Sequence, residues 1–533
     1  MNGLGRRRSS VEESNEESSA MRRTCLGCAG IAIGMLAAAL DGSALARDFV
    51  LTIGGGYSPL GNQASIERNA NFFRELVAER LPEARHDILF SDGNSPGRDV
   101  QYRAAPGSIP RSWRLLAQVF QQEKNWGMRY RSHAVPGVRG AATLENLSAW
   151  FKDVAQAAAA GDRVLIYATA HGGGSTNKSD PQDTTLYLWN SQKLSAKDFE
   201  GYLSTLKPGV NVVLVMTQCH AGGFASAALD GPPMEMATLD GGGLRCGFFS
   251  TSFDRPAAGC TPDVDGDNEH EYSSYFWAAL RGRGRDGEPL PPVDYDGDGR
   301  TSLAEAHTFA VIHAQSIDIP LRTSEAYLKR IAPFGASSLV GPFSIHMPYE
   351  RIRERADAGQ LAALDNLSAE LQLASVDRGR EVLEVAARAI ESRDQCDAQL
   401  KALAPQYERA CKSIRAALVN RWPELANPWS AEVAELVADE GEVIADAIEA
   451  HRDFADLRTL QTERKRLADE RWTHDRRYAK SQRLLRLLED VAIAGNLQTG
   501  GSSEHWQRYV QLVALENQSL LPTMSNPAAA EIR

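Results

Sequence analysis

The sequence has no excess of basic residues and no apolar run long enough to cross a bilayer. Its 533 residues include 58 Lys and Arg against 69 Asp and Glu, which gives a formal net charge of −11 at pH 7. This balance argues against binding to nucleic acid or to an anionic membrane surface. The apolar stretch at residues 29–40 is shorter than the about 20 residues that a transmembrane helix needs. We therefore expect no membrane span in the mature chain.

The amino-terminal segment has the pattern of a secretory signal peptide. Met21-Arg22-Arg23 supply positive charge, residues 29–40 form an apolar core, and Ala44-Leu45-Ala46 provide a small-residue cleavage site. We predict that the protein is exported to the periplasm or secreted, and that residues 1–46 are removed by cleavage near Ala46.

Cysteine is scarce, with 7 residues in the whole chain, two of them before the predicted cleavage site. Outside the cytoplasm the others could form disulfides. Cys246 with Cys260, and Cys396 with Cys411, are local pairs, and their pairing would leave Cys219 as a free thiol. The alternative is that none of the five is oxidised.

Strand-like and helix-like segments alternate through the first part of the chain, which predicts an α/β fold with a mostly parallel sheet flanked by helices. Residues 93–140 are rich in Gly, Pro and Arg, and we expect a long loop there with a short helix at 113–120. The expected strands are residues 49–53, 86–90, 164–170, 212–217 and 247–253, and the expected helix caps between them are Ser65, Thr143 and Ser195.

A change of composition near residues 333–348 indicates a boundary between a domain at residues 47–335 and a second one at 349–495. The second is rich in Ala, Glu, Leu and Arg with helical spacing, which predicts an all-α hairpin or bundle. We expect breaks between its helices at Pro405 and at residues 423–428. Its helices could bind a protein partner or form a solvated appendage, and residues 496–533 would be a tail.

Two of the expected strands end in residues that can do chemistry. Residues 164–170 lead into His171-Gly172, and residues 212–217 lead into Gln218-Cys219-His220. Parallel strands joined by right-handed crossovers end at the same edge of a sheet, so His171 and Cys219 should face each other. An imidazole can activate a thiol as a nucleophile, and the amides of Gly172 and Cys219 could stabilise an oxyanion. His220 should point elsewhere and be structural.

At these residues the chain resembles the caspase and legumain superfamily of cysteine peptidases, in which a strand-terminal His-Gly precedes a strand-terminal Cys-x-x-Gly. The resemblance covers about residues 48–330 and implies a caspase-like fold that hydrolyses peptide bonds in a peptide or protein substrate. It implies Cys219 as the nucleophile and His171 as the general acid. Gln218 departs from the metacaspase pattern, which has an acid before the Cys. The Asn that orients the imidazole in legumain-like enzymes has no certain match, although Asn62 lies in the corresponding loop.

Substrate preference should depend on the loop at residues 54–63 and on the ends of the strands that follow. The rival functions for the same residues are a catalytically inactive caspase-like calcium-binding scaffold and an amidase or transpeptidase that uses the same dyad. Asp254 and Arg255 give opposite predictions for the residue at the cleavage site. The candidate substrate-binding residues are Asn62, Thr217, Ser252 and Asp254.

Residues 294–305 match the calcium loop of an EF-hand position by position, which predicts calcium as a cofactor. Gly299 allows the sharp turn, and prolines replace the incoming helix, so we expect a structural site; the alternative is an Asp/Gly turn without metal. A poorer version of the loop begins at Asp263. The predicted ligands are Asp294, Asp296, Asp298, the carbonyl of Arg300 and Glu305.

Overall fold

The computed structural model describes residues 46–125, 127–229, 244–263, 270–339, 341–428 and 430–520. The predicted signal peptide before Ala46 lies outside these residues, as do Asp265, Asp267 and Glu269 of the poorer acidic loop.

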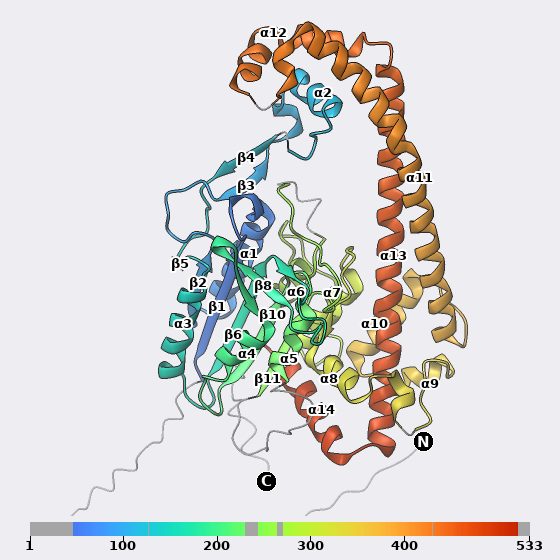
Figure 1. Ribbon diagram of the computed structural model, residues 1–533. Helices are drawn as coiled ribbons and strands as arrows, with labels where there is room; N and C mark the ends of the chain where they lie inside the picture. Colours follow the sequence, from blue (N-terminus) through green and yellow to red (C-terminus); the bar gives the residue numbers. More distant parts are fainter. Residues whose placement is uncertain are drawn as a thin grey trace, which may run out of the picture. The chain divides into compact units, whose positions relative to one another are not determined.

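The described chain is built on a 7-stranded sheet with the order β12-β11-β10-β6-β1-β2-β5 (Figure 1). Every neighbouring pair in it is parallel except β11 and β12. The expected mostly parallel sheet is therefore confirmed. Its strands are β1 (Asp48–Gly55), β2 (Arg85–Phe90), β5 (Val138–Gly140), β6 (Arg163–Ala170), β10 (Asn211–Met216), β11 (Arg245–Phe249) and β12 (Leu321–Arg322).

Helices cover both faces of this sheet. One hydrophobic cluster joins it to α3 (Leu144–Ala157), α4 (Ala196–Leu203) and α5 (Ala225–Ala228). The other cluster joins it to α1 (Ala64–Arg80), α6 (Tyr272–Arg281) and α7 (Leu303–His313). Ile166 of β6 belongs to the first cluster and its neighbour Leu165 to the second, because successive side chains of a strand point to opposite faces. Burial of both faces explains why β6 and β10 are continuous apolar runs.

Local capping signals place two of these helices correctly. The hydroxyls of Thr143 and Ser195 accept the backbone N–H groups of Asn146 and Asp198, as expected for N-caps. The prediction that Ser65 caps α1 is wrong, because α1 already begins at Ala64 and the Ser65 hydroxyl accepts the N–H of Thr261 instead.

Residues 93–140 contain more regular structure than predicted. β3 (Val100–Arg103) pairs antiparallel with β4 (Met128–Arg131), and α2 (Arg111–Val119) is the short helix that the sequence predicted. A third sheet combines β7 (Gly172–Gly173), β8 (Thr185–Leu188) and β9 (Gln192–Ser195) directly after His171.

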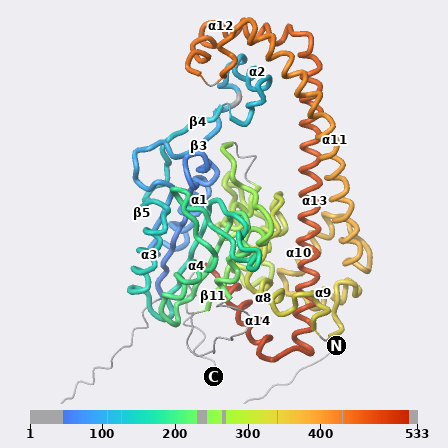
Figure 2. Tube along the Cα trace, viewed as in Figure 1, coloured from blue at the N-terminus to red at the C-terminus, as the bar shows by residue number. Residues whose placement is uncertain are grey.

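The carboxyl-terminal part of the chain is helical, as predicted, and two long helices, α11 and α13, run side by side through most of it (Figures 1 and 2). The predicted break at Pro405 is wrong: Pro405 lies inside α11. A proline costs a helix one backbone hydrogen bond, and the packing of α11 along α13 compensates for that loss. The predicted break after α11 is present as a turn at Pro423–Ala426. The helices are α8 (Thr323–Ile331), α9 (Tyr349–Arg353), α10 (Ala358–Glu370), α11 (Arg378–Arg421), α12 (Ala431–Glu449), α13 (Phe454–Gly500) and α14 (Ser503–Glu516).

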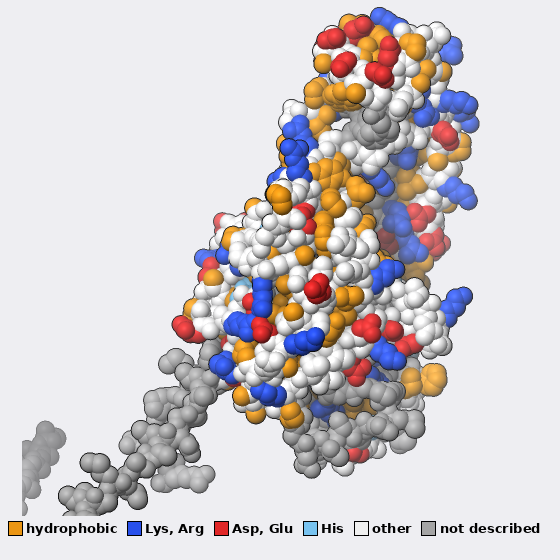
Figure 3. Space-filling model, turned by 60° about the vertical axis from the view of Figure 1, so that its left-hand side comes forward, with side chains coloured by type: hydrophobic (Ala, Val, Ile, Leu, Met, Phe, Trp, Pro, Cys, Tyr) orange, Lys and Arg blue, Asp and Glu red, His pale blue; other side chains and the backbone are white. Residues whose placement is uncertain are grey.

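The tip of the helical region also contacts α2. Leu116 and Val119 of α2 share a hydrophobic cluster with α11 and α12. Acidic side chains gather over α12 (Figure 3), and Arg111 of α2 forms ion pairs with Glu442, Asp446 and Glu449 of α12 at 2.7–3.0 Å. Among the described helices, none combines the length and apolarity needed to cross a membrane.

The predicted local disulfides do not form, because all five described cysteines are free thiols. Cys396 and Cys411 lie on the continuous helix α11. A rise of 1.5 Å per residue separates their Cα atoms by about 22 Å, whereas a disulfide requires less than about 7 Å. Cys246 is buried in β11 and Cys260 is exposed. Cys219 is therefore a free thiol without any disulfide between the other four described cysteines.

Arg483 is a buried cation of the helical region that binds the sheet-bearing part. Arg483 of α13 is 3% exposed. Its guanidinium donates hydrogen bonds to the backbone carbonyls of Val311, Ala314 and Asp318 at 2.8–2.9 Å and of Ser316 at 3.1 Å. Burial lowers the pKa of Arg483 to about 10, and the four carbonyls satisfy its N–H groups in return.

We predict that Arg483→Met lowers the free energy of unfolding by about 3 kcal/mol, because buried carbonyls lose their donors. Urea denaturation followed by circular dichroism measures this change. Arg380→Met is the control, since Arg380 lies exposed on α11 and pairs only with Glu384. Equal stability of Arg483→Met and the wild type would contradict the anchoring role.

Candidate active site

The sheet brings the His171 and Cys219 motifs together, as the sequence predicted. β6 and β10 are adjacent and parallel, with Ala168 opposite Met216, so both strands end at one edge. Beyond that edge the two backbones touch: a Cβ on Gly172 would lie 2.2 Å from the carbonyl oxygen of Cys219. Only glycine permits so close an approach at position 172.

The ring of His171 is held by two oxygens from the loop after β1. Its Nε2 lies 2.7 Å from the carbonyl oxygen of Gly61 and 2.8 Å from Oε1 of Gln63. Both oxygens are acceptors, so Nε2 carries the proton and Nδ1 of the neutral ring is left as the acceptor. The ring of Tyr57 packs edge-on against the imidazole at a centroid distance of 5.5 Å. Burial lowers the pKa of His171, and the hydrogen bond to Gly61 only partly opposes this.

The thiol of Cys219 is half-buried and faces the backbone of Ala257. Its Sγ accepts the Ala257 N–H at 3.3 Å and donates to the Ala257 carbonyl at 3.7 Å. Burial raises the pKa of Cys219; the bonds to Ala257 lower it, and the carboxylate of Asp318 raises it further. With the pKa of His171 lowered as well, the resting pair is a neutral thiol and a neutral imidazole. In the described part of the chain no hydrogen bond joins the two side chains.

The backbone beside Cys219 is suited to bind an oxyanion. A 3-10 turn, Ala221–Phe224, follows Cys219 and leads into α5. Among the described residues the N–H of Cys219 donates to no backbone carbonyl, and its own thiol is the one acceptor beside it. This N–H is therefore available to a developing negative charge, and Gly172 lies directly against the same peptide.

The side chain of Asn62 is held within its own loop, and its part in substrate binding stays a prediction. Asn62 is fully buried; its Oδ1 accepts the Gly56 N–H at 3.0 Å, and its Nδ2 donates to Ser91 and to the carbonyl of Asp99. Asn62 therefore has both polar atoms of its side chain bonded within the protein. It shapes the loop that presents Gly61 and Gln63 to His171. Sequence reasoning selected this loop but missed Gln63, one position further on.

The other predicted substrate residues divide into buried and exposed ones. Thr217 and Ser252 are buried, and their hydroxyls donate to the Ala168 carbonyl at 2.9 Å and to Oδ1 of Asp254 at 2.6 Å. Both hydroxyls are thus engaged within the protein, and their contact with a substrate stays a prediction. Asp254 is exposed and stays available to a substrate. His220 was predicted to be structural, and its Nδ1 lies 2.7 Å from the carbonyl oxygen of Phe253.

The predicted calcium loop brings three of its ligands together. Oxygens of Asp294, Asp296 and Glu305 lie within 4.8 Å of one another. The Asp294 carboxylate accepts the N–H groups of Gly297, Asp298 and Gly299, which wraps the loop around it. Asp298 is not part of this group, and its Oδ1 accepts the N–H of Arg300.

The donor chemistry of this loop fits a hard cation, since the three side chains present carboxylate oxygens only. Glu305 also accepts the N–H of Ser302 in a capping box at the start of α7. If both carboxylate oxygens of Glu305 coordinated a cation, the cation would replace the Ser302 N–H as the partner of Oε2.

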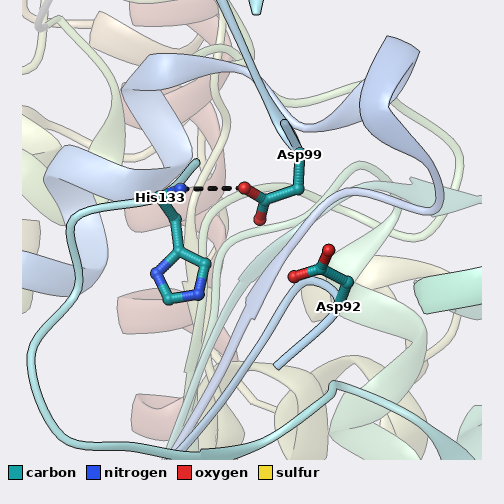
Figure 4. Close-up of side chains that lie close together, drawn as sticks. All are labelled: Asp92, Asp99 and His133. Atoms are coloured by element: carbon teal, nitrogen blue, oxygen red, sulfur yellow. Dashed lines mark hydrogen bonds between the residues drawn. The ribbon is translucent and has the colours of Figure 1, made fainter. Parts of the chain in front are cut away.

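A second cluster of possible metal ligands was not predicted. Asp92, Asp99 and His133 converge beside the Asn62 loop (Figure 4). The His133 N–H donates to Oδ1 of Asp99 at 2.8 Å, and His133 Nε2 lies 2.7 Å from the Gly93 carbonyl oxygen. Burial and the charge of Asp99 raise the pKa of Asp92. Both nitrogens of the His133 ring already have partners, whereas Oδ1 of Asp92 is buried and, among the described residues, has no hydrogen-bond partner.

The sequence matches no protein-family model, and no curated protein is significantly similar to it. Among solved structures, the crystal structure of protein GSU0716 from Geobacter sulfurreducens matches with a TM-score of 0.31 and 12% identity, over 52% of this chain and 92% of that one. A likeness this weak supports no inference about function.

We predict that alkylation of Cys219 by iodoacetamide accelerates with pH, with a midpoint above the about 8.5 of a free cysteine. The reason is that burial favours the neutral thiol and raises its pKa. Stopped reactions at a series of pH values, with the Cys219 peptide quantified by mass spectrometry, measure this midpoint. A midpoint below 8.5 would contradict the neutral resting pair.

Proposed function

We propose that this protein is a cysteine endopeptidase in which Cys219 is the nucleophile and His171 the general acid and base. The observation that supports it most is the anchoring of His171 Nε2 by Gly61 and Gln63. This anchoring leaves Nδ1 as the basic atom of the ring. His171 follows β6 and Cys219 follows β10, and these two strands are adjacent. A half-buried thiol and an N–H that donates to no described backbone carbonyl complete the set at the same sheet edge.

The reaction follows from these roles. As Sγ of Cys219 attacks the substrate carbonyl carbon, Nδ1 of His171 takes the thiol proton, and the N–H of Cys219 stabilises the oxyanion. The imidazolium then protonates the leaving amine as the C–N bond breaks, which leaves a thioester on Cys219. Water attacks the thioester and gives its proton to Nδ1. As the C–S bond breaks, the imidazolium returns this proton to Sγ, which restores the thiol and releases the carboxylic acid product.

The neutral resting pair determines when this chemistry can begin. Because burial disfavours both charged forms, a thiolate–imidazolium pair forms only as the substrate carbonyl takes up the negative charge. Proton transfer is then coupled to attack. The free thiol is correspondingly a weak nucleophile towards reagents other than a bound substrate.

Cys219→Ala should lower kcat/KM for peptide hydrolysis at least about 1,000-fold, because no other group can form the acyl-enzyme. A mixed peptide library with mass-spectrometric identification of the cleaved bonds measures activity and cleavage-site preference together. Cys396→Ala is the matched control, since Cys396 is buried on α11 away from the dyad.

Residual hydrolysis of the same bonds by Cys219→Ala would contradict the proposal. Absence of cleavage by the wild type would favour the inactive scaffold. Transfer of the acyl group to added amines in place of water would favour a transpeptidase.

We also propose that residues 294–305 bind calcium as a structural ion, which is supported by the convergence of Asp294, Asp296 and Glu305. A cation held there would join the segment before α7 to the first turn of that helix. The site is separate from the dyad, so calcium would stabilise the fold and take no part in the chemical steps.

The wild-type melting temperature should rise in roughly 10 mM calcium chloride relative to EDTA, a concentration above the range typical of extracellular sites. Asp296→Ala should lose this increment, because one of the three converging carboxylates is removed. Asp286→Ala, in the preceding loop, should keep it. The same increment in Asp296→Ala and wild type would refute the site.

A further inference from the structure

A segment at residues 255–262, here called the strap, crosses the candidate active site. At one end, the carbonyl of Arg255 accepts the N–H of His220, next to the nucleophile. At the other end, the N–H of Thr261 donates to the hydroxyl of Ser65 at 2.9 Å, and the N–H of Ser65 donates to the carbonyl of Thr261 at 3.3 Å. Ser65 lies two positions after Gln63. The strap therefore runs from the turn that carries Cys219 to the loop that holds His171.

The middle of the strap lies on the nucleophile. Both the N–H and the carbonyl of Ala257 contact Sγ of Cys219, at 3.3 and 3.7 Å. A scissile carbonyl must approach a nucleophile to about 3–3.5 Å before bond formation. Ala257 already occupies part of that space beside the half-buried Sγ, so movement of the strap would open a wider approach for a substrate.

The long helix α13 holds the strap through two contacts. The guanidinium of Arg255 lies over the ring of Tyr478 of α13, 5.4 Å from its centroid. Asp318, which is fully buried, accepts the N–H of Ala258 at 2.7 Å. The carbonyl of the same Asp318 accepts a bond from Arg483 of α13 at 2.8 Å. One contact is direct, and the other passes through the loop that Arg483 anchors.

We propose that the strap is an autoinhibitory element that shields Cys219 and that α13 keeps it closed. The proposal rests on the peptidase function and assigns a role to the helical region: it regulates access to the nucleophile. Any event that shifts α13 or breaks the contact between Arg255 and Tyr478 would favour the open strap.

The test measures how fast Cys219 reacts with a bulky thiol reagent, fluorescein-5-maleimide, in the full chain. Arg255→Ala should raise the labelling rate of Cys219 about fivefold, the change expected for loss of one partly exposed cation–π contact. Arg464→Ala is the matched control, because Arg464 makes the same kind of contact with Tyr407 at 4.1 Å within the pair of long helices. It should label at the wild-type rate. Mass spectrometry of the labelled peptides separates Cys219 from the exposed Cys260.

Tyr478→Ala should reproduce the effect of Arg255→Ala, and the double variant should label no faster than either single one, since one contact is lost in each case. Wild-type labelling rates in both single variants, or additive effects in the double variant, would overturn the role of α13. Labelling does not require hydrolysis. Faster labelling without any peptide cleavage would therefore support the strap and refute the peptidase function, whereas cleavage with unchanged labelling would do the reverse.

Discussion

The parallel pairing of β6 with β10 is the constraint on which the candidate site depends. It fixes the two strand ends side by side, so that Gly172 packs against the carbonyl of Cys219. Two helical layers bury both faces of the pair and hold its register. His171 and Cys219 are thus placed by the core of the protein, and the loop after β1 adds only the orientation of the imidazole. A site built this way keeps its geometry while the segments above it vary.

Burial shifts the pKa values of His171 and Cys219 in opposite directions. It lowers the pKa of His171 and raises that of Cys219, which keeps both neutral. The strap contributes to this burial through Ala257, and Asp318 links the strap to Arg483 of α13. The state of the thiol and its accessibility therefore depend on the same segment, and through it on helices distant in the sequence.

The sequence was sufficient for the five long strands of the main sheet, for the caps at Thr143 and Ser195 and for the placement of His171 and Cys219 at one sheet edge, because these depend on hydrophobic pattern and on short-range hydrogen bonds. It missed the short strands β3, β4, β5 and β12. It was not sufficient to predict where side chains point within a loop. Gln63 contacts His171, whereas the neighbouring Asn62 binds the backbone of its own loop. Pro405 misled because long-range packing outweighs a local helix signal. The strap could not be predicted from the sequence, because its contacts join residues that are far apart in the chain.

The central claim is that Cys219 forms a covalent acyl bond with help from His171. Reaction with a set of peptidyl acyloxymethyl ketones, read out by intact mass and by peptide mapping, tests it most directly. The account predicts a single adduct on Cys219, absent in Cys219→Ala and formed far more slowly in His171→Ala. Adducts distributed among the other cysteines, or equal rates in His171→Ala and wild type, would contradict it.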